Sequence, residues 1–174
     1  ILRVLSRLVQ EGKILRIQNS IYYKPEFNRF LKGRPVPPDV NEVIKVISSR
    51  NKETLQIHGS SAVNKLGLST QVPLTKVFYT NGPSREVIIA GTRVKFIHTE
   101  NQNILQASGT EVGMALSALI FLGREHVDQE VVRQVKSRLS ENHFKRLKRM
   151  QMSSWLKERL SDPAVKESSY ALAG

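Results

Sequence analysis

The segment that most restricts how this chain can fold is a proline-rich stretch at 33–38. Three of its last four residues are prolines, and it begins with Gly33. Proline lacks a backbone N–H and fixes φ, so such a stretch opposes both a helix and a central strand. We therefore predict a linker at 33–38. It would separate a short module at 1–32 from a larger domain at 39–163, followed by a tail at 164–174.

Charge is the most unusual feature of the composition. The chain has 174 residues, of which 40% are hydrophobic and 24% charged, as in an ordinary soluble globular protein. Its net charge is nevertheless +12, and the first 34 residues hold eight basic but only two acidic side chains. A basic surface attracts nucleic acid or acidic protein surfaces. A general solubilising excess of lysine is the alternative, but the concentration of charge at the front favours a binding role.

Several classes of protein are excluded or disfavoured. The chain has no cysteine, which excludes disulfides, thiolate zinc sites and cysteine nucleophiles. The longest apolar run, at 114–122, is too short to cross a bilayer, and no signal peptide is visible. We expect a cytoplasmic protein that does not bind membranes. Because Ile1 lies inside an amphipathic pattern, we also expect the chain to be a fragment of a longer protein.

Catalytic patterns are missing from the sequence. None of the four histidines forms an i, i+4 pair, as a helical zinc site would need. There is no glycine-rich phosphate loop and no Gly-x-Ser-x-Gly elbow, and the acidic residues are widely spread. We therefore predict no enzymatic activity, no catalytic residues, no cofactor and no metal. A nuclease whose ligands come together only in three dimensions stays open.

The first 23 residues have the pattern of a helix, a glycine and a hairpin. Residues 1–11 place their apolar side chains on one helical face, and Gly12 is suited to end that helix. Strand-forming residues at 14–23 flank a polar turn at 18–20. A winged-helix module ends in this way, with its recognition helix followed by a two-stranded wing. A helix and hairpin of any small α+β domain is the alternative interpretation.

The polar face of this helix and the wing supply the candidate DNA contacts. We expect Arg3, Ser6 and Arg7 to reach base edges, while Lys13 and Arg16 contact phosphates. The complete set of predicted DNA-binding residues is Arg3, Ser6, Arg7, Gln10, Lys13, Arg16, Asn19 and Lys24.

The remaining sequence predicts an α+β fold, in which a partial winged helix-turn-helix precedes a mixed domain with a small antiparallel sheet and C-terminal helices. The apolar periodicity and turn residues place the helices and strands. The predicted elements are a helix at 39–51 capped by Asp39, a helix at 59–67 capped by serine, a hairpin at 76–91 turning at 81–83, a strand at 92–98, a buried helix from 108 to 123, and helices at 127–139 and 155–160.

One block carries a resemblance to a known family. Its matching residues are Gly59, Ala62, Leu66, Gly67, Leu68, Ser69, Gln71, Pro73, Thr80, Asn81 and Gly82. With the preceding helix and hairpin, the block resembles the AbiEi-type antitoxins of bacterial type IV toxin–antitoxin systems. There a winged helix precedes a domain with a G-x-x-A-x-x-x-L-G-L-[ST]-x-Q-x-P segment and a T-N-G hairpin.

The resemblance covers nearly the whole chain and implies two activities. The winged helix would bind inverted repeats in its own promoter and so repress it. The rest of the chain would neutralise a nucleotidyltransferase-like toxin, either directly or indirectly. The oligomeric state stays open.

Candidate partner-binding residues lie in two further places. They are Gln71 and Arg85 in the block above, and the basic cluster Lys145, Arg146, Lys148 and Arg149. Local structural roles and a solvated helix face are the alternatives, and Trp155 is interpreted as a core anchor. Two rival functions are an adaptor that binds protein but not DNA, and an RNA-binding protein. The low aromatic content, 6%, argues against base stacking on a sheet.

Overall fold

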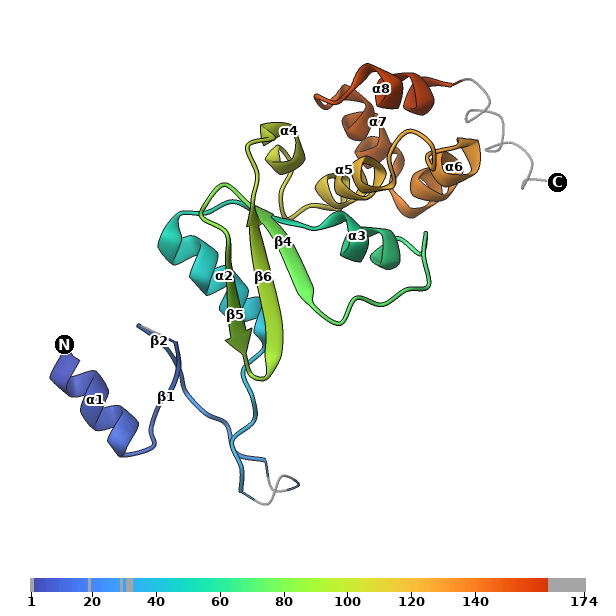
Figure 1. The fold of residues 1–174 in the computed structure, drawn as a ribbon. Coiled ribbons are helices and arrows are strands. Elements are labelled where there is room, and N and C mark those ends of the chain that lie inside the picture. Colours follow the sequence, from blue (N-terminus) through green and yellow to red (C-terminus); the bar gives the residue numbers. More distant parts are fainter. Residues whose placement is uncertain (1, 19, 29, 31–32, 163–174) are drawn as a thin grey trace. The chain divides into compact units, whose positions relative to one another are not determined.

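The computed structural model describes residues 2–18, 20–28, 30 and 33–162. The predicted α+β class is confirmed, with one two-stranded antiparallel sheet, one mixed four-stranded sheet and helices throughout (Figure 1). The predicted tail at 164–174 lies outside the described residues.

The chain divides into two compact units. The first comprises 1–52 and 87–94, and the second comprises 53–86 and 95–174. The predicted linker at 33–38 contains no helix, and Pro35 forms an isolated bridge with Phe27. Whether a domain boundary falls at this linker stays a prediction.

The N-terminal elements of the first unit follow the sequence pattern. Helix α1 (Leu2–Gln10) is followed by Gly12, whose φ of +67° is the left-handed conformation that ends many helices. Strands β1 (Leu15–Gln18) and β2 (Ile21–Tyr23) then pair antiparallel, with Leu15 opposite Tyr23. The predicted helix–glycine–hairpin arrangement is therefore confirmed.

Helix α2 (Val40–Asn51) also begins where the sequence predicts. The Asp39 carboxylate accepts hydrogen bonds from the backbone N–H groups of Asn41, at 2.7 Å, and Glu42, at 2.9 Å. These bonds satisfy donors that a helix start leaves without intrahelical partners. The apolar stripe predicted for this helix is buried at Val43, Ile44 and Ile47.

The hairpin predicted at 76–91 is wrong. In the four-stranded sheet the order is β3-β4-β6-β5, so β4 (Lys76–Thr80) and β5 (Arg85–Ile89) are not neighbours. The tight turn lies instead between β5 and β6 (Thr92–His98), at Ala90 and Gly91, whose φ angles are +48° and +80°. Two positive φ angles are what a type I′ hairpin turn requires. Residues 81–83 serve a crossover, and β3 (Leu55–Ile57), which no pattern predicted, pairs antiparallel with β4.

Two helices form the centre of the second unit. Helix α3 (Gly59–Lys65) packs against α5 (Glu111–Leu122), which is buried nearly all round and followed by Gly123, as predicted. A Cβ atom on Gly59 would overlap Cβ of Phe121 and lie 2.8 Å from the Ser117 carbonyl oxygen. Glycine at this position therefore allows the two helices to approach closely.

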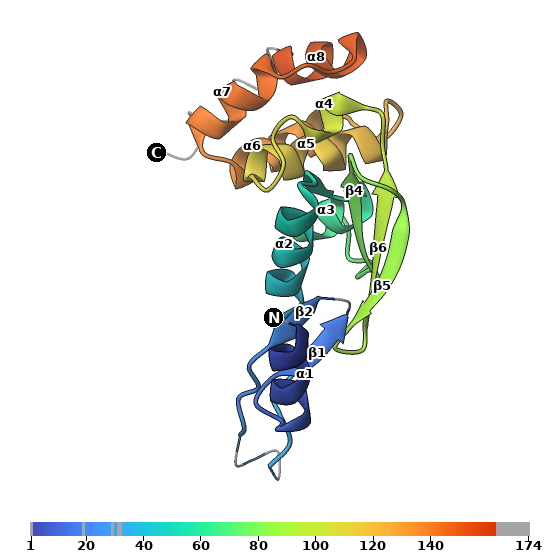
Figure 2. The ribbon, with the colours of Figure 1, turned by 90° about the vertical axis from the view of Figure 1, so that its left-hand side faces the viewer.

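The remaining helices surround α5. They are α4 (Gln102–Leu105), α6 (Gln129–Arg138), α7 (Glu141–Arg149) and α8 (Ser154–Ser161), gathered beyond one end of β4 and β6 (Figure 2). Trp155 is partly buried and packs against the same apolar core, in agreement with its interpretation as a core anchor. Among the described residues no helix has both the length and the apolar character needed to span a bilayer.

Candidate nucleic-acid interface

The polar residues of α1 form one continuous exposed stripe. Arg3, Ser6, Arg7 and Gln10 are spaced i, i+3, i+4 and i+7, so they fall on one helical face, and all four are exposed. Leu5 and Leu8 lie on the other face and are half-buried. At about 1.5 Å per residue, the helix is about 13 Å long, comparable with the major-groove width of about 12 Å.

The cations at the end of α1 are held only weakly within the protein. Arg7 Nε lies 3.6 Å from the Glu11 carboxylate, and Lys13 Nζ lies 2.8 Å from its other oxygen. The side chains of Arg7 and Lys13 are 70% and 66% exposed. Exposed ion pairs of this kind contribute about 0–1 kcal/mol, so a phosphate can displace Glu11.

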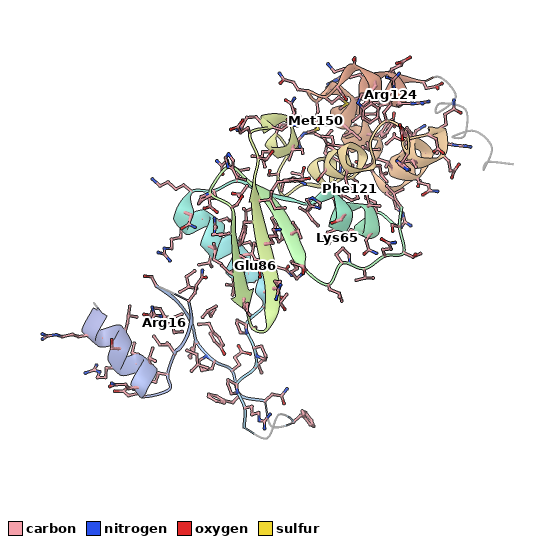
Figure 3. All side chains as sticks on the ribbon, viewed as in Figure 1. Arg16, Lys65, Glu86, Phe121, Arg124 and Met150 are labelled. Carbon is pink, nitrogen blue, oxygen red and sulfur yellow. The ribbon has the colours of Figure 1, made fainter. Side chains whose placement is uncertain are left out.

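The hairpin adds two exposed basic side chains. Arg16 projects from β1, and its Nε donates a long hydrogen bond of 3.4 Å to the Gln18 carbonyl (Figure 3). Lys24 is exposed immediately after β2, while Asn19 lies outside the described residues. Every other predicted DNA-binding residue is thus on the surface, and its contact with DNA stays a prediction.

The second basic cluster lies on α7. Arg146 and Arg149 are exposed, whereas Lys145 pairs with Glu141 at 2.7 Å and thereby lowers the pKa of that carboxyl group. Lys148 lies over the Phe144 ring, 5.6 Å from its centroid. These two lysines border a cavity of about 210 Å³ that Phe144 and residues of α6 and α8 also line. The four basic residues therefore differ in how far the fold occupies them.

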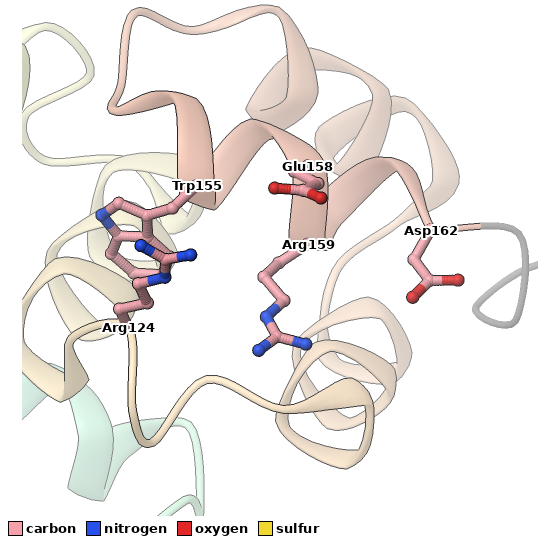
Figure 4. A pocket seen from close by; sticks show the side chains of 5 residues that line it. All are labelled: Arg124, Trp155, Glu158, Arg159 and Asp162. Carbon is pink, nitrogen blue, oxygen red and sulfur yellow. The ribbon is translucent and has the colours of Figure 1, made fainter.

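A second cavity, of about 190 Å³, lies at the side of α8 (Figure 4). The lining residues are Arg124, Trp155, Glu158, Arg159 and Asp162, and Arg124 lies across the indole ring. Two guanidinium groups and two carboxylates balance in charge, so this cavity has no clear preference for an anion or a cation. We assign it no role.

The structure gives Arg85 an internal partner. Its Nη1 donates to Glu53 Oε1 at 2.8 Å, its Nη2 bonds the other carboxylate oxygen, and the guanidinium lies 4.4 Å from the Phe96 ring centroid. The Glu53 side chain is only 6% exposed. The predicted T-N-G residues support this pair, because a Cβ on Gly82 would collide with Glu53. Contact between Arg85 and an external partner stays a prediction.

His58 is a structural residue that sequence reasoning missed. The prediction of a serine cap for α3 is wrong, because His58 Nδ1 accepts the Ser60 backbone N–H at 3.2 Å and lies 2.9 Å from its hydroxyl group. The ring also lies 4.7 Å from that of Tyr79 and 5.4 Å from that of Phe121. Burial lowers the pKa of His58 below its usual value of 6.5. Its place directly before a helical segment was the only sequence signal.

Comparison with known proteins places the chain in a family. A family model matches residues 1–147, which is most of the chain and includes α1, the hairpin and α3 to α6. The chain belongs to DUF6088. This is described as a family of unknown function, so DUF6088 membership does not by itself indicate an activity. No curated protein and no solved structure matches the chain.

Proposed function

We propose that this DUF6088 chain is a DNA-binding transcriptional autorepressor and antitoxin that acts in the cytoplasm. Helix α1 is the recognition helix and the β1–β2 hairpin is the wing, and together they bind inverted repeats in the chain's own promoter. The observation that carries the proposal is the exposed stripe of Arg3, Ser6, Arg7 and Gln10, followed directly by the hairpin.

The side-chain chemistry of the stripe suits a duplex groove. Arginine donates paired hydrogen bonds to guanine, glutamine can pair with adenine, and serine is short enough to allow close approach. Lys13 and Arg16 follow on the turn and the first hairpin strand, where a wing meets the phosphate backbone. Half of the chain's positive charge excess lies within residues 1–34, which supports this part as the electrostatic footprint.

The antitoxin half of the proposal is supported by the resemblance in the block 59–82. The partner is a nucleotidyltransferase-like toxin. The exposed cations of α7, Arg146 and Arg149, are suited to an acidic surface on such a protein.

A fluorescence-anisotropy titration of the protein's own promoter tests the repressor half. The wild-type protein should bind at low salt, with log K falling by about 0.9 per phosphate contact for each unit of log salt concentration. The double variant Arg3→Glu/Arg7→Glu should abolish binding. The control Lys45→Glu/Lys157→Glu makes the same change in net charge at exposed positions elsewhere and should retain it.

Toxin rescue in cells separates the proposal from its rivals. Under the proposal, Arg3→Glu/Arg7→Glu loses the promoter but still protects cells from the toxin. A folded wild-type protein that fails to bind its promoter at low salt would remove the repressor half and favour the adaptor. Preference for an RNA of the same sequence over the promoter duplex would favour the RNA-binding alternative.

A further inference from the structure

The connection between α3 and β4 presents two large aliphatic side chains to solvent. The loop at 69–75 makes a wide excursion before the chain enters β4 (Figure 1). Within it, Val72 is 75% exposed and Leu74 is 99% exposed. Single exposed aliphatic residues are common, but two of them on either side of one proline form a small apolar projection.

The base of the loop is fixed by hydrogen bonds. The Asn64 side-chain amide donates to the Ser69 carbonyl at 3.2 Å, and the Ser69 hydroxyl accepts the Gln71 backbone N–H at 3.1 Å. Pro73 further restricts the backbone between the two aliphatic residues. A loop with a defined base loses less conformational entropy when a partner binds it.

The fold accounts for the residues before the loop but not for those at its tip. Ala62 and Leu66 are buried in the core, and Gly59 allows α3 to approach α5. By contrast, Val72 and Leu74 are absent from the core cluster of the described residues. Their aliphatic character therefore has no explanation within the part of the chain that the structure describes.

The surroundings of the loop indicate the charge of its partner. Lys65 is exposed at the end of α3 (Figure 3), and Lys76 begins β4. The Arg138 guanidinium is also close, since Nη2 would lie 3.0 Å from a Cβ on Gly67. The sequence between Glu53 and Glu86 contains no carboxylate side chain. A second copy of this chain would bring the same cations and a net charge of +12, so it is a poor occupant.

We propose that the loop at 69–75 docks into an apolar depression rimmed by carboxylates on a partner protein. Resting on the proposed antitoxin function, that partner is the nucleotidyltransferase-like toxin, which the chain then neutralises by direct contact. Val72 and Leu74 enter the depression, and Lys65 and Arg138 face its acidic rim. Removing water from the two aliphatic side chains provides the affinity, while the cations orient the encounter.

Isothermal titration calorimetry with the purified toxin encoded beside this chain tests the docking surface. We expect Val72→Ser/Leu74→Ser to weaken binding about tenfold to a hundredfold, because two aliphatic side chains no longer enter the depression. The control Val46→Ser/Ile88→Ser alters two residues that are 51% and 66% exposed elsewhere, and should bind as the wild type does. Unchanged urea midpoints would verify that both variants are folded.

Three outcomes would overturn the docking proposal. Equal affinity of Val72→Ser/Leu74→Ser and wild type would show that the loop does not touch the toxin. A wild-type dimer in sedimentation that Val72→Ser/Leu74→Ser converts to monomer would assign the loop to a second copy. Rescue of toxin-expressing cells without a measurable complex would overturn docking while the antitoxin function stands. Failure of the wild type in both rescue and binding would overturn both.

Discussion

Helices α1 and α5 differ in what determines their sequences. In α5, seven of the twelve residues are buried, and packing against α3 accounts for their small or apolar side chains. In α1, no residue whose burial is described is fully buried, and its arginines face solvent. Packing therefore explains the composition of α5, whereas burial does not explain the polar stripe of α1. Exposed residues that core packing does not require are the stronger candidates for function.

The same contrast appears between two arginines. Arg85 makes a bidentate pair with Glu53, whose side chain is 6% exposed, while Arg7 makes a single contact of 3.6 Å with Glu11 at the surface. Breaking a buried pair costs about 3–5 kcal/mol, whereas an exposed pair contributes about 0–1 kcal/mol. Arg85 is thus committed to the fold and Arg7 is available for a ligand.

Substitution of Gly59 should have the largest effect on stability. In Gly59→Ala the new methyl group overlaps Phe121 and crowds the Ser117 carbonyl, so α3 and α5 must separate. We expect the free energy of unfolding to fall by about 3 kcal/mol, measured by urea denaturation. Ser61→Ala in the same helix is the control and should cost far less. A stable Gly59→Ala protein would show that the close approach of the two helices is not required.

Removal of the Glu53 charge should have the next largest effect. Glu53→Gln keeps the shape of the side chain but leaves the guanidinium of Arg85, which is 23% exposed, without a carboxylate. We expect the free energy of unfolding to fall by about 2 kcal/mol, less than for a fully buried pair because solvent reaches Arg85. Glu125→Gln alters an exposed carboxylate and should leave the urea midpoint unchanged. Equal midpoints for the two variants would contradict the structural role of the pair.

The His58 cap predicts a dependence of stability on pH. Burial lowers the pKa of His58 in the folded protein, so below pH 6.5 the unfolded chain binds a proton more readily than the folded one. Stability should therefore fall as the pH is lowered from 7.5 to 5.5, and no corresponding loss should occur above that range. His58→Asn retains a capping side chain that does not titrate, and should reduce the pH dependence. A pH dependence identical to the wild type would assign the effect to other groups.

Local patterns predicted the elements that depend on neighbouring residues. The apolar period of α1, α2 and α5 and the cap at Asp39 could be read directly from the sequence. The crossover at 81–83 could not, because Asn81 accepts the Thr54 backbone N–H at 2.8 Å, a contact between residues 27 positions apart. The same holds for the candidate site. The exposed stripe of α1 follows from helical periodicity, whereas the pairing of Arg85 with Glu53 depends on strand order.

The smallest change in stability should accompany the loss of the proposed function. In Arg3→Ala/Arg7→Ala only exposed side chains and one surface ion pair are removed, so the free energy of unfolding should change by no more than about 0.5 kcal/mol. Promoter affinity should fall much further, by about 1–3 kcal/mol for each arginine that no longer reaches a base. Both quantities can be measured on one preparation, by urea denaturation and by fluorescence anisotropy. A destabilised variant would mean that the stripe serves the fold, and α1 would then resemble α5 instead of contrasting with it.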